Sequence, residues 1–470
     1  MFVGRASVPA FYREETTMVS RISRARAAVL SLALLAMLAP ASLHAAAGDE
    51  HWSNRFDALG LDGTTFALLT DGTGLVAGGD FPHAGGVLVN RVARLEDQTW
   101  TPYGTGMSGP VRALAIYNGE LIAGGAFAQA GGNNIPYLAR WNGSAWTSVG
   151  VGVNGPVEAL VVKDGLLYVG GEFTQAGGSS ANRIAKWNGT AWSTLGTGLG
   201  SYCYGLAVHN NELYATGDFQ TAGGSPAKYV AKWSGTAWSA LGTGLSYDGL
   251  CLASWNGNLV VGGSFISAGG NTATSVAKWN GSAWSAIGIG LNSFVTSLTV
   301  YNGNLVAGGL FDASGASSMK HVARWNGSNW AAFGSGTVTD VFALGLGGQS
   351  LFVGGGFQTA GGKTSKFIGQ WDDVIVGVDD APATFTLEAP IPSPARGTAA
   401  FSYRLAEAGR VRLTIHDPRG RQVATLVDDV MPAGRHQAAW NGEGASSGVY
   451  FARLDDGRHE RVQRFVRIGN

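Results

Sequence analysis

The sequence predicts an all-β protein, and three observations support this fold class. Glycine accounts for 73 of the 470 residues, about twice the usual ~7%, and each glycine inside a helix costs roughly 1 kcal/mol. Hydrophobic residues make up 45% of the chain and aromatic residues 10%, which excludes a disordered chain. The third observation is a repeat of constant length.

Phenylalanine recurs at a fixed interval of 46 residues. The series consists of Phe81, Phe127, Phe173, Phe219, Phe265, Phe311 and Phe357. A tryptophan series from Trp141 to Trp371 keeps the same interval, and in five repeats a second tryptophan follows five residues later. Self-similarity with a period of about 40–50 residues is typical of a propeller or a solenoid.

One repeat contains four short strands, predicted at residues 157–162, 167–171, 183–187 and 192–196. The Asp164-Gly165 and Asn188-Gly189 pairs between them favour tight hairpin turns. If the corresponding Asn142-Gly143 turn has two residues, Trp146 lies opposite Ala139. Each repeat is therefore predicted to be a four-stranded antiparallel blade of a β-propeller.

The number of first strands predicts seven blades. These strands begin near Thr65, Val111, Val157, Cys203, Gly249, Val295 and Val341. The last repeat has no fourth strand after Trp371, whereas an unpaired strand is expected at residues 55–60, with Phe56 in the tryptophan position. We expect this N-terminal strand to complete the last blade, which removes open sheet edges. A solenoid would need polar caps, which the sequence does not show.

The propeller repeats resemble known families. The double glycine after the second strand and the tryptophan in the fourth resemble Kelch-type and galactose-oxidase-type propellers. The string VAKWNGSAWSAIGIGLNSFVTSLTVYNGNLVAGGLF is similar to repeats of the fungal cortical cell-polarity marker family and of related bacterial secreted propellers. The resemblance covers residues 52–376 and implies the fold, whereas propellers have many unrelated functions.

Residues 1–47 are predicted to be a signal peptide. Arg21, Arg24 and Arg26 precede an apolar run at residues 27–38, and small residues follow at 45–47, as in secretory signals. Met18 is a plausible true start. The apolar run is shorter than the ~20 residues that a membrane span needs, so a membrane anchor is the less favoured alternative. We expect a secreted or outer-surface protein with no membrane span after cleavage.

A second domain is predicted at residues 385–470, after a linker at 377–384. From Asp379 onward the chain has 12 arginines and no lysine. Val411, Leu413 and Ile415 alternate with polar residues, and about seven strands fit into fewer than 90 residues. This pattern predicts an Ig-like β-sandwich without the cysteine pair of antibody domains.

Motifs in this second domain resemble the C-terminal Ig-like sorting domain of type IX secretion and the Ig-like domain of the flagellar hook-capping protein. The matching pieces are Pro392-Ser393-Pro394, Asp417 with Gly420-Arg421, Ala433-Gly434-Arg435-His436, Trp440-Asn441-Gly442 and Ser447-Gly448-Val449-Tyr450. The resemblance implies that export machinery recognises residues 385–470. The alternative is a stabilising module on a protein that stays in the periplasm.

The sequence predicts no catalytic constellation, metal site or cofactor. The charges balance at 32 basic and 32 acidic residues, whereas a nucleic-acid-binding surface needs a basic patch. The eight histidines lack metal-ligand spacing. Two glycine-rich stretches, at 104–109 and 150–155, match a dinucleotide fingerprint but precede strands, so they are read as repeat turns. The protein is therefore expected not to be an enzyme.

Two smaller groups of residues allow more than one interpretation. Cys203 and Cys251 begin the first strands of adjacent blades; they either form a disulfide or are small buried residues. Asp80, Glu172 and Asp218 share one repeat position; they either form a carboxylate cluster or are solvated loop residues.

The candidate binding surface is the face that carries the long second-to-third and fourth-to-first connections, because binding residues concentrate on long loops. At the start of the innermost strand the repeat varies, with Phe66, Arg112, Glu158, Tyr204, Leu250, Thr296 and Phe342. Of these, Phe66, Arg112, Glu158, Tyr204 and Phe342 are the candidate ligand-binding residues, although repeat drift explains the variation equally well.

Three functions remain open from the sequence. The first is a secreted or surface propeller that binds a protein or a glycan on the long-loop face. The second is an extracellular carbohydrate-active or oxidase-type enzyme, and the third is an envelope scaffold without a small ligand. An enzyme should show His, Tyr, Asp or Glu converging at one channel mouth, whereas a binder should show exposed aromatic residues or a shallow polar groove.

Overall fold

The computed structural model describes residues 47–71, 74–96 and 98–373. In the C-terminal part it describes residues 385–387, 390, 395–396, 398–405, 409–431, 434–442 and 444–468. The signal-peptide prediction up to residue 46, the linker at 377–384 and the motif at 392–394 lie outside the described residues.

Strands make up every regular element of the described residues except the short 3-10 helix η2 (Asp49–His51), which confirms the all-β class. None of the described helices is long and apolar enough to span a membrane.

The described residues form six consecutive four-stranded antiparallel sheets and a seventh sheet of three strands. Sheet 1 comprises β1 (Thr64–Thr70), β2 (Leu75–Asp80), β5 (Val92–Glu96) and β6 (Thr99–Pro102). Sheet 2 comprises β7 (Val111–Tyr117), β8 (Glu120–Gly125), β9 (Leu138–Trp141) and β10 (Trp146–Ser148). Sheet 3 comprises β11 (Val157–Lys163), β12 (Leu166–Gly171), β15 (Ile184–Trp187) and β16 (Trp192–Thr194). Sheet 4 comprises β17 (Cys203–His209), β18 (Glu212–Gly217), β21 (Val230–Trp233) and β22 (Trp238–Ala240). Sheet 5 comprises β23 (Gly249–Trp255), β24 (Asn258–Gly263), β27 (Val276–Trp279) and β28 (Trp284–Ala286). Sheet 6 comprises β29 (Val295–Tyr301), β30 (Asn304–Gly309), β33 (Val322–Trp325) and β34 (Trp330–Ala332). Sheet 7 comprises β35 (Val341–Gly347), β36 (Ser350–Gly355) and β39 (Ile368–Asp372).

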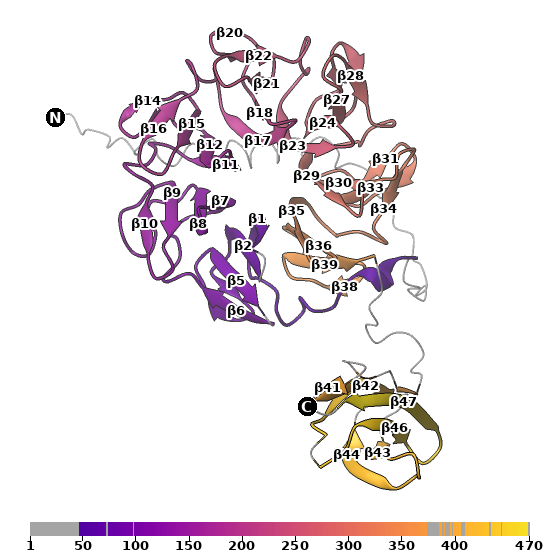
Figure 1. Ribbon diagram of the computed structural model, residues 1–470. Helices are drawn as coiled ribbons and strands as arrows, with labels where there is room; N and C mark the ends of the chain where they lie inside the picture. The colour runs from indigo at the N-terminus through magenta and orange to yellow at the C-terminus, as the bar shows by residue number, and fades with distance from the viewer. Residues whose placement is uncertain are drawn as a thin grey trace, which may run out of the picture. The chain divides into compact units, whose positions relative to one another are not determined.

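These sheets form a closed β-propeller. The first strand of each sheet contacts the first strand of the next, and β35 contacts β1. Figure 1 shows the sheets arranged around a common centre with these first strands innermost. Since each sheet packs against two neighbours, only short strand edges remain at the rim.

The repeated aromatic residues form the core between the sheets. The seven phenylalanines at the 46-residue interval are each at most 1% exposed. In sheet 2, Trp146 lies directly opposite Trp141, and the tryptophan pairs of five sheets have ring centroids 5.3–5.6 Å apart. The second tryptophan of each pair also donates its indole N–H to the preceding connection, as Trp146 does to the carbonyl of Tyr103 at 2.8 Å.

The pairing of Trp146 with Ala139, expected for a two-residue turn, is wrong. Ser148 lies opposite Ala139 instead, because the hairpin loop has four residues. The side-chain oxygen of Asn142 accepts hydrogen bonds from the backbone N–H groups of Ser144 and Ala145 at 3.0 and 2.9 Å. This Asx-type arrangement stabilises the longer loop.

Close packing between neighbouring sheets explains the first glycine of the second strand's double glycine. A Cβ atom at Gly124 would lie 2.4 Å from the side chain of Val157 in the next sheet, and one at Gly170 would lie 2.6 Å from the Cys203 sulfur. A larger residue at either position would push the neighbouring innermost strand away.

The N-terminal segment completes the seventh sheet at a different residue from the one predicted. Trp52 forms an antiparallel bridge with Trp371, and the N–H of Ser53 donates to the carbonyl of Gln370 at 2.9 Å. The Trp52 indole donates to the carbonyl of Phe333 at 3.0 Å, the contact that the second tryptophan makes in other sheets.

The predicted closing strand at residues 55–60 is therefore wrong, and Trp52 rather than Phe56 occupies the tryptophan position. Residues after Ser53 leave the sheet in a turn, in which the Asp57 N–H donates to the Asn54 carbonyl at 3.1 Å. Phe56 is fully buried and packs edge-on against Phe352 at 6.3 Å.

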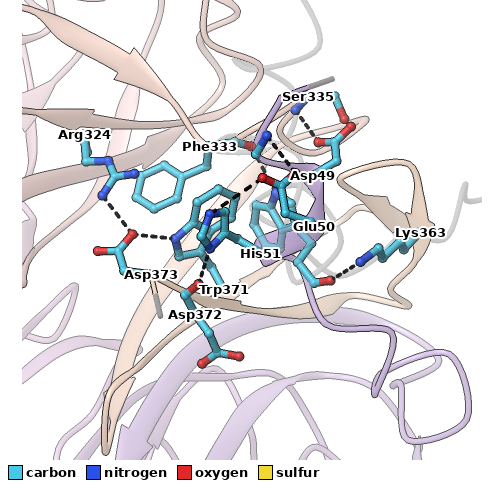
Figure 2. A network of polar contacts seen from close by, with 12 residues as sticks. Asp49, Glu50, His51, Arg324, Phe333, Ser335, Lys363, Trp371, Asp372 and Asp373 are labelled. Atoms are coloured by element: carbon cyan, nitrogen blue, oxygen red, sulfur yellow. Dashed lines mark hydrogen bonds and ion pairs between the residues drawn. The ribbon is translucent and has the colours of Figure 1, made fainter. Parts of the chain in front are cut away.

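Polar contacts hold the closing segment on the seventh sheet, as Figure 2 shows. Asp49, only 3% exposed, accepts a hydrogen bond from the backbone N–H of Ser335 at 2.6 Å. His51 Nδ1 lies 2.6 Å from the Asp372 carbonyl, and its ring stacks on Trp371 at 4.9 Å. Lys363 Nζ donates to the Trp52 carbonyl at 2.7 Å.

The same network extends to sheet 6 through Asp373. This carboxylate accepts hydrogen bonds from the Arg324 guanidinium at 2.8 Å, the Trp371 indole at 2.9 Å and the Asn302 amide at 2.9 Å. Burial opposes ionisation of Asp373, but these donors and the charge of Arg324 lower its pKa below the ordinary value. The carboxylate is thus held in its charged form at the closure.

The C-terminal part forms two sheets around one core. One sheet contains β40 (Thr386–Leu387), β42 (Ala399–Leu405) and β45 (Gly434–Trp440); the other contains β41 (Ala395–Arg396), β43 (Gly409–His416), β44 (Gln422–Met431), β46 (Gly448–Asp455) and β47 (Glu460–Ile468). Phe401 and Tyr403 from the first sheet pack with Leu413, Tyr450 and Phe465 from the second. This part is therefore a two-layer β-sandwich.

Candidate functional site at the mouth of the channel

Every innermost strand of the propeller contains a β-bulge at its second or third residue. In β7, Val111 pairs with Gly125 and Ala113 pairs with Gly124, so Arg112 has no pairing partner in the ladder. The equivalent register shifts occur at Phe66, Glu158, Tyr204, Leu250, Thr296 and Phe342. The seven variable positions predicted from the sequence are thus the seven bulge residues, and bulges commonly redirect side chains at functional sites.

These bulge side chains meet across sheet boundaries. Arg112 of sheet 2 forms an ion pair with Glu158 of sheet 3, and the Phe66 and Phe342 rings of sheets 1 and 7 lie 5.6 Å apart. The Thr296 hydroxyl of sheet 6 donates to the Val341 carbonyl of sheet 7 at 2.6 Å. Because the innermost strands surround the centre (Figure 1), these residues form a ring around the centre of the propeller.

The second-to-third and fourth-to-first connections lie together beside this ring. In sheet 3 the former contains the two-residue strands β13 (Gln175–Ala176) and β14 (Ser179–Ser180). Val153 of the preceding connection bridges to Ala176. The bulges lie at the end of the innermost strands that the fourth-to-first connections lead into. The ring of bulge residues is therefore on the long-loop face, and this end of the innermost strands is here called the mouth.

One arc of the mouth is charged. Arg112 Nη1 pairs with Glu158 and lies 3.9 Å from a carboxylate oxygen of Glu172. The Glu158 side chain is only 8% exposed, compared with 27% for Arg112 and for Glu172. The arginine thus offsets the cost of burying the Glu158 charge.

Tyr204 lies on the same arc. Burial raises the pKa of Tyr204 above its ordinary value, and four carboxylates add to this effect, from Asp218, Asp248, Glu172 and Glu158. These carboxylates come from sheets 3 and 4 and from the connection to sheet 5. The Tyr204 hydroxyl therefore stays protonated and remains a hydrogen-bond donor at neutral pH.

A second ring of residues near the mouth has left-handed backbone conformations. The residue immediately before the third strand has a positive φ in all seven sheets. The values are 77° at Arg91, 65° at Tyr137, 64° at Arg183, 67° at Tyr229, 62° at Ser275, 71° at His321 and 65° at Phe367. In sheet 3, the Arg183 N–H donates to the Phe173 carbonyl and its carbonyl accepts from Gly171. Non-glycine residues with positive φ are uncommon and cost energy, and they concentrate at functional sites.

Aromatic side chains accompany the charged arc. The Arg183 guanidinium lies 5.9 Å from the centre of the Tyr202 ring, and Tyr202 and Tyr204 lie 6.4 Å apart. The Tyr229 and Tyr247 rings are 6.1 Å apart, and Tyr247 is 52% exposed.

The opposite arc of the mouth is mainly apolar. Phe66 and Phe342 contact one another, and Leu250 belongs to the partly buried residues. The Thr296 hydroxyl is already satisfied by the carbonyls of Val341 and Gly308, at 2.6 and 3.2 Å. The structure therefore brings Arg112, Glu158 and Tyr204 into one arc and places the two phenylalanines in another.

The three carboxylates that share a repeat position do not form one cluster. Asp80 Oδ1 accepts a hydrogen bond from Arg91 Nε at 3.0 Å, whereas Glu172 and Asp218 both lie near Tyr204. Among the described residues, no group of three or more His, Cys, Asp or Glu side chains could hold a metal ion.

Cys203 and Cys251 are both free thiols in the structure. The Cys203 sulfur lies 3.7 Å from the Gly205 carbonyl, and the Cys251 sulfur lies 3.6 Å from the Val295 carbonyl. Burial raises the pKa of both thiols, which disfavours the reactive thiolate.

Sequence reasoning missed Tyr202, Asp248 and Arg183 as site residues. Asp248 and Tyr202 immediately precede the innermost strands β23 and β17, and Arg183 has the positive φ described above. Their repeat positions vary along the chain as the bulge positions do, which is the signal that could have identified them.

The comparisons with known proteins support the propeller fold. A family model for a domain of unknown function, DUF5122, described as a β-propeller, matches residues 163–188. No curated protein matches the chain.

Two solved structures are similar at low identity. The first is PorZ, an essential bacterial surface component of the type IX secretion system of Porphyromonas gingivalis: 14% identity and a TM-score of 0.43, with 87% of this chain and 60% of PorZ covered. The second is a protein of unknown function from Bacteroides thetaiotaomicron: 13% identity and a TM-score of 0.29, with 55% of this chain and 68% of that protein covered. The chain thus spans 60% of the length of PorZ.

Proposed function

We propose that the protein is a secreted or cell-surface β-propeller that binds a protein or a glycan at the mouth of its channel. The observation that carries the proposal is the bulge ring, whose side chains differ from sheet to sheet while the scaffold repeats. The phenylalanine and tryptophan positions are needed for packing, whereas a bulge residue has no partner in the ladder. A variable ring on a rigid frame suits ligand recognition.

The charged arc is the part of the ring best suited to a polar ligand. Arg112, Glu158 and the neutral Tyr204 hydroxyl offer donors and acceptors within one arc. The exposed ring of Tyr247, 6.1 Å from the Tyr229 ring, adds an apolar surface. Pockets that bind specific ligands combine apolar surface with a few fixed polar groups in this way.

Binding at the mouth is tested by screening the mature full-length chain on glycan and protein arrays. The Arg112→Gln/Glu158→Gln double variant removes both charges together and so avoids an unpaired buried charge. We expect it to weaken binding at least about tenfold, or 1.4 kcal/mol. The control is Asp164→Asn, in the turn between β11 and β12, where the aspartate is 61% exposed. Equal binding by the double variant and the control would refute the proposal.

Export is proposed to depend on both ends of the chain. The signal peptide would direct the protein across the inner membrane, and residues 385–470 would be recognised by sorting machinery; the motif resemblance in the C-terminal sandwich supports the second step. Deletion of residues 385–470 is expected to retain the propeller in the periplasm. Fractionation that finds the truncated protein secreted normally would contradict the sorting role.

A second candidate function is an extracellular carbohydrate-active enzyme. It is favoured by the convergence of Tyr204 with four carboxylates, because two nearby carboxyl groups are what glycosidic bond hydrolysis requires. Glu158 and Glu172, which share Arg112, are the candidate pair. If the arrays identify a glycan, release of reducing ends that stops in Glu158→Gln and Glu172→Gln would establish the enzyme. Binding without product would exclude it for that glycan.

A further inference from the structure

Four residues of sheets 3 and 4 and their connection form a corner of the mouth, here called the Tyr202 corner: Arg183, Tyr202, Tyr204 and Asp218. The backbone N–H of Asp218 donates to the Tyr202 carbonyl at 3.3 Å. The Arg183 guanidinium lies 5.9 Å from the Tyr202 ring centre, and the Tyr204 ring is 6.4 Å from that of Tyr202.

Two polar atoms of this corner are buried without a hydrogen-bond partner. Asp218 Oδ1 is an acceptor and Arg183 Nε is a donor, and neither finds a partner among the described residues. Leaving such a group unsatisfied destabilises the folded protein. Unpaired buried groups in a folded protein call for an explanation, and a missing ligand is one.

The opposite character of these two atoms restricts the ligand. A cation would satisfy Asp218 but would leave the Arg183 Nε donor without an acceptor. An anion would satisfy Arg183 but would meet the carboxylates of Glu158, Glu172, Asp218 and Asp248, which all act on Tyr204. A hydroxyl group both donates and accepts hydrogen bonds, so neighbouring hydroxyls can satisfy Asp218 and Arg183 together.

The aromatic rings nearby suit the remaining surface of such a ligand. Tyr202 and Tyr204 border the two unpaired atoms. Tyr229 extends the surface toward the exposed Tyr247. The apolar C–H face of a sugar ring can pack on tyrosine rings while its hydroxyls bond to the edge.

We infer that the Tyr202 corner is a subsite for a neutral sugar unit, with Asp218 accepting from one hydroxyl and Arg183 donating to another. The inference rests on the proposed function, since it assigns a ligand class to one part of the same mouth. It favours a glycan over a protein as the ligand.

Sheet 1 provides a matched control for both polar residues. Asp80 and Arg91 occupy the same repeat positions as Asp218 and Arg183. In sheet 1, however, the two side chains bond to each other, with Arg91 Nε 3.0 Å from Asp80 Oδ1. Each control residue therefore has the same chemistry and the same repeat position as its counterpart. Asp80 and Arg91 share one sheet and satisfy each other, whereas Arg183 belongs to sheet 3 and Asp218 to sheet 4.

Calorimetric titration of the mature full-length chain tests the inference. The neutral probes are cellohexaose, mannohexaose, maltohexaose and N-acetylchitohexaose; the charged probes are the glucosamine hexamer and hexagalacturonate. We expect a neutral probe to bind at least about tenfold more tightly than either charged one. Asp218→Asn and Arg183→Met should each weaken that binding about tenfold or more, whereas Asp80→Asn and Arg91→Met should change it less than about twofold.

Thermal unfolding of the free protein distinguishes the loss of a ligand contact from damage to the fold, because damage to the fold would lower Tm. Asp218→Asn replaces an unsatisfied buried carboxylate oxygen, so we expect Tm to stay the same or to rise by roughly 1–3 °C. A fall of several degrees would show that the carboxylate has a structural partner and would overturn its assignment as a sugar ligand.

The outcomes separate this inference from the proposed function. Tighter binding of a charged probe, no binding of any neutral probe, or unchanged affinity in Asp218→Asn overturns the sugar subsite. If a protein partner then binds and the Arg112→Gln/Glu158→Gln variant loses it, the mouth remains a binding site for another ligand class. Failure of both sets of experiments overturns the inference and the proposed function together.

Discussion

The sixth and seventh sheets of the propeller reach nearly the same arrangement in different ways. In sheet 6 the hairpin from β33 leads directly to β34, and Trp330 donates its indole N–H to the Ile287 carbonyl at 3.1 Å. In sheet 7 the outer position is filled by Trp52 from the other end of the chain, which donates to the Phe333 carbonyl at 3.0 Å.

The difference lies in how much pairing each outer segment retains. Sheet 6 has three consecutive residue pairs between its outer strands, whereas the closing segment forms the single bridge Trp52 to Trp371. The segment gains instead the polar contacts of Asp49, His51 and Lys363 in Figure 2. The closing segment is not joined to its neighbour by a hairpin, so side-chain contacts hold it in place. A continuous outer strand is held instead by the backbone hydrogen bonds of its ladder.

The largest expected effect comes from removing the closing tryptophan. Trp52 is fully buried, and Trp52→Ala should destabilise the propeller by about 3–5 kcal/mol. Chemical denaturation measures the loss. Limited proteolysis measures whether residues 47–60 are released before global unfolding.

Trp330→Ala in sheet 6 is the matched variant for that comparison. It leaves a cavity of similar chemistry, because Trp330 is 6% exposed, but its strand stays tethered by the hairpin. We expect similar loss of stability without early cleavage near the N-terminus. Equal protease protection in both variants would show that closure does not depend on Trp52.

A smaller effect is expected at Asp49. Asp49→Ala removes a buried carboxylate acceptor from the part-buried N–H of Ser335, which should cost about 1–3 kcal/mol. Denaturation midpoints of Asp49→Ala and Asp49→Asn measure this contribution, since asparagine keeps an acceptor oxygen. No loss in either variant would refute a role for this contact in closure.

The smallest effect is a dependence of closure on pH. Because the pKa of Asp373 is lowered in the folded state, its stabilisation is complete above the unfolded value of about 3.9. That stabilisation is lost as pH falls through the lower folded pKa. Asp373→Asn should therefore flatten the acid limb of the stability curve below about pH 4. An unchanged acid limb in urea titrations would count against the assignment.

The repeat made most of the propeller predictable, and its failure at the closure has a simple cause. Trp52 precedes Trp100 by 48 positions rather than 46, so a fixed interval passes over it. The turn that begins at Asn54 accommodates the extra length. The interval gives position 54, and Trp52 and Phe56 lie equally far from it on either side. The side chain of Phe56 packs on Phe352 instead of filling the outer position of the sheet.

The site was only partly predictable for a different reason. The variable ring from Phe66 to Phe342 was found because its members share a repeat position. The convergence of Arg183, Asp218 and Asp248 on the Tyr202 and Tyr204 pair depends on three different repeat positions in neighbouring sheets. Neither a bulge nor a left-handed residue other than glycine has a reliable sequence signature, so this convergence required the structure.

The closure also determines when the protein can finish folding. His51 and Asp372 are 321 positions apart in the chain, and contacts between such distant segments slow folding. During synthesis, six sheets can pair locally while the seventh lacks its outer strand. A circular permutant that joined residue 373 to residue 49 through a short loop and opened the chain between sheets 3 and 4 would make closure a local event. The closure of the seventh sheet should then form faster in this permutant. The late, long-range contact should form instead between sheets 3 and 4, where the chain has been opened.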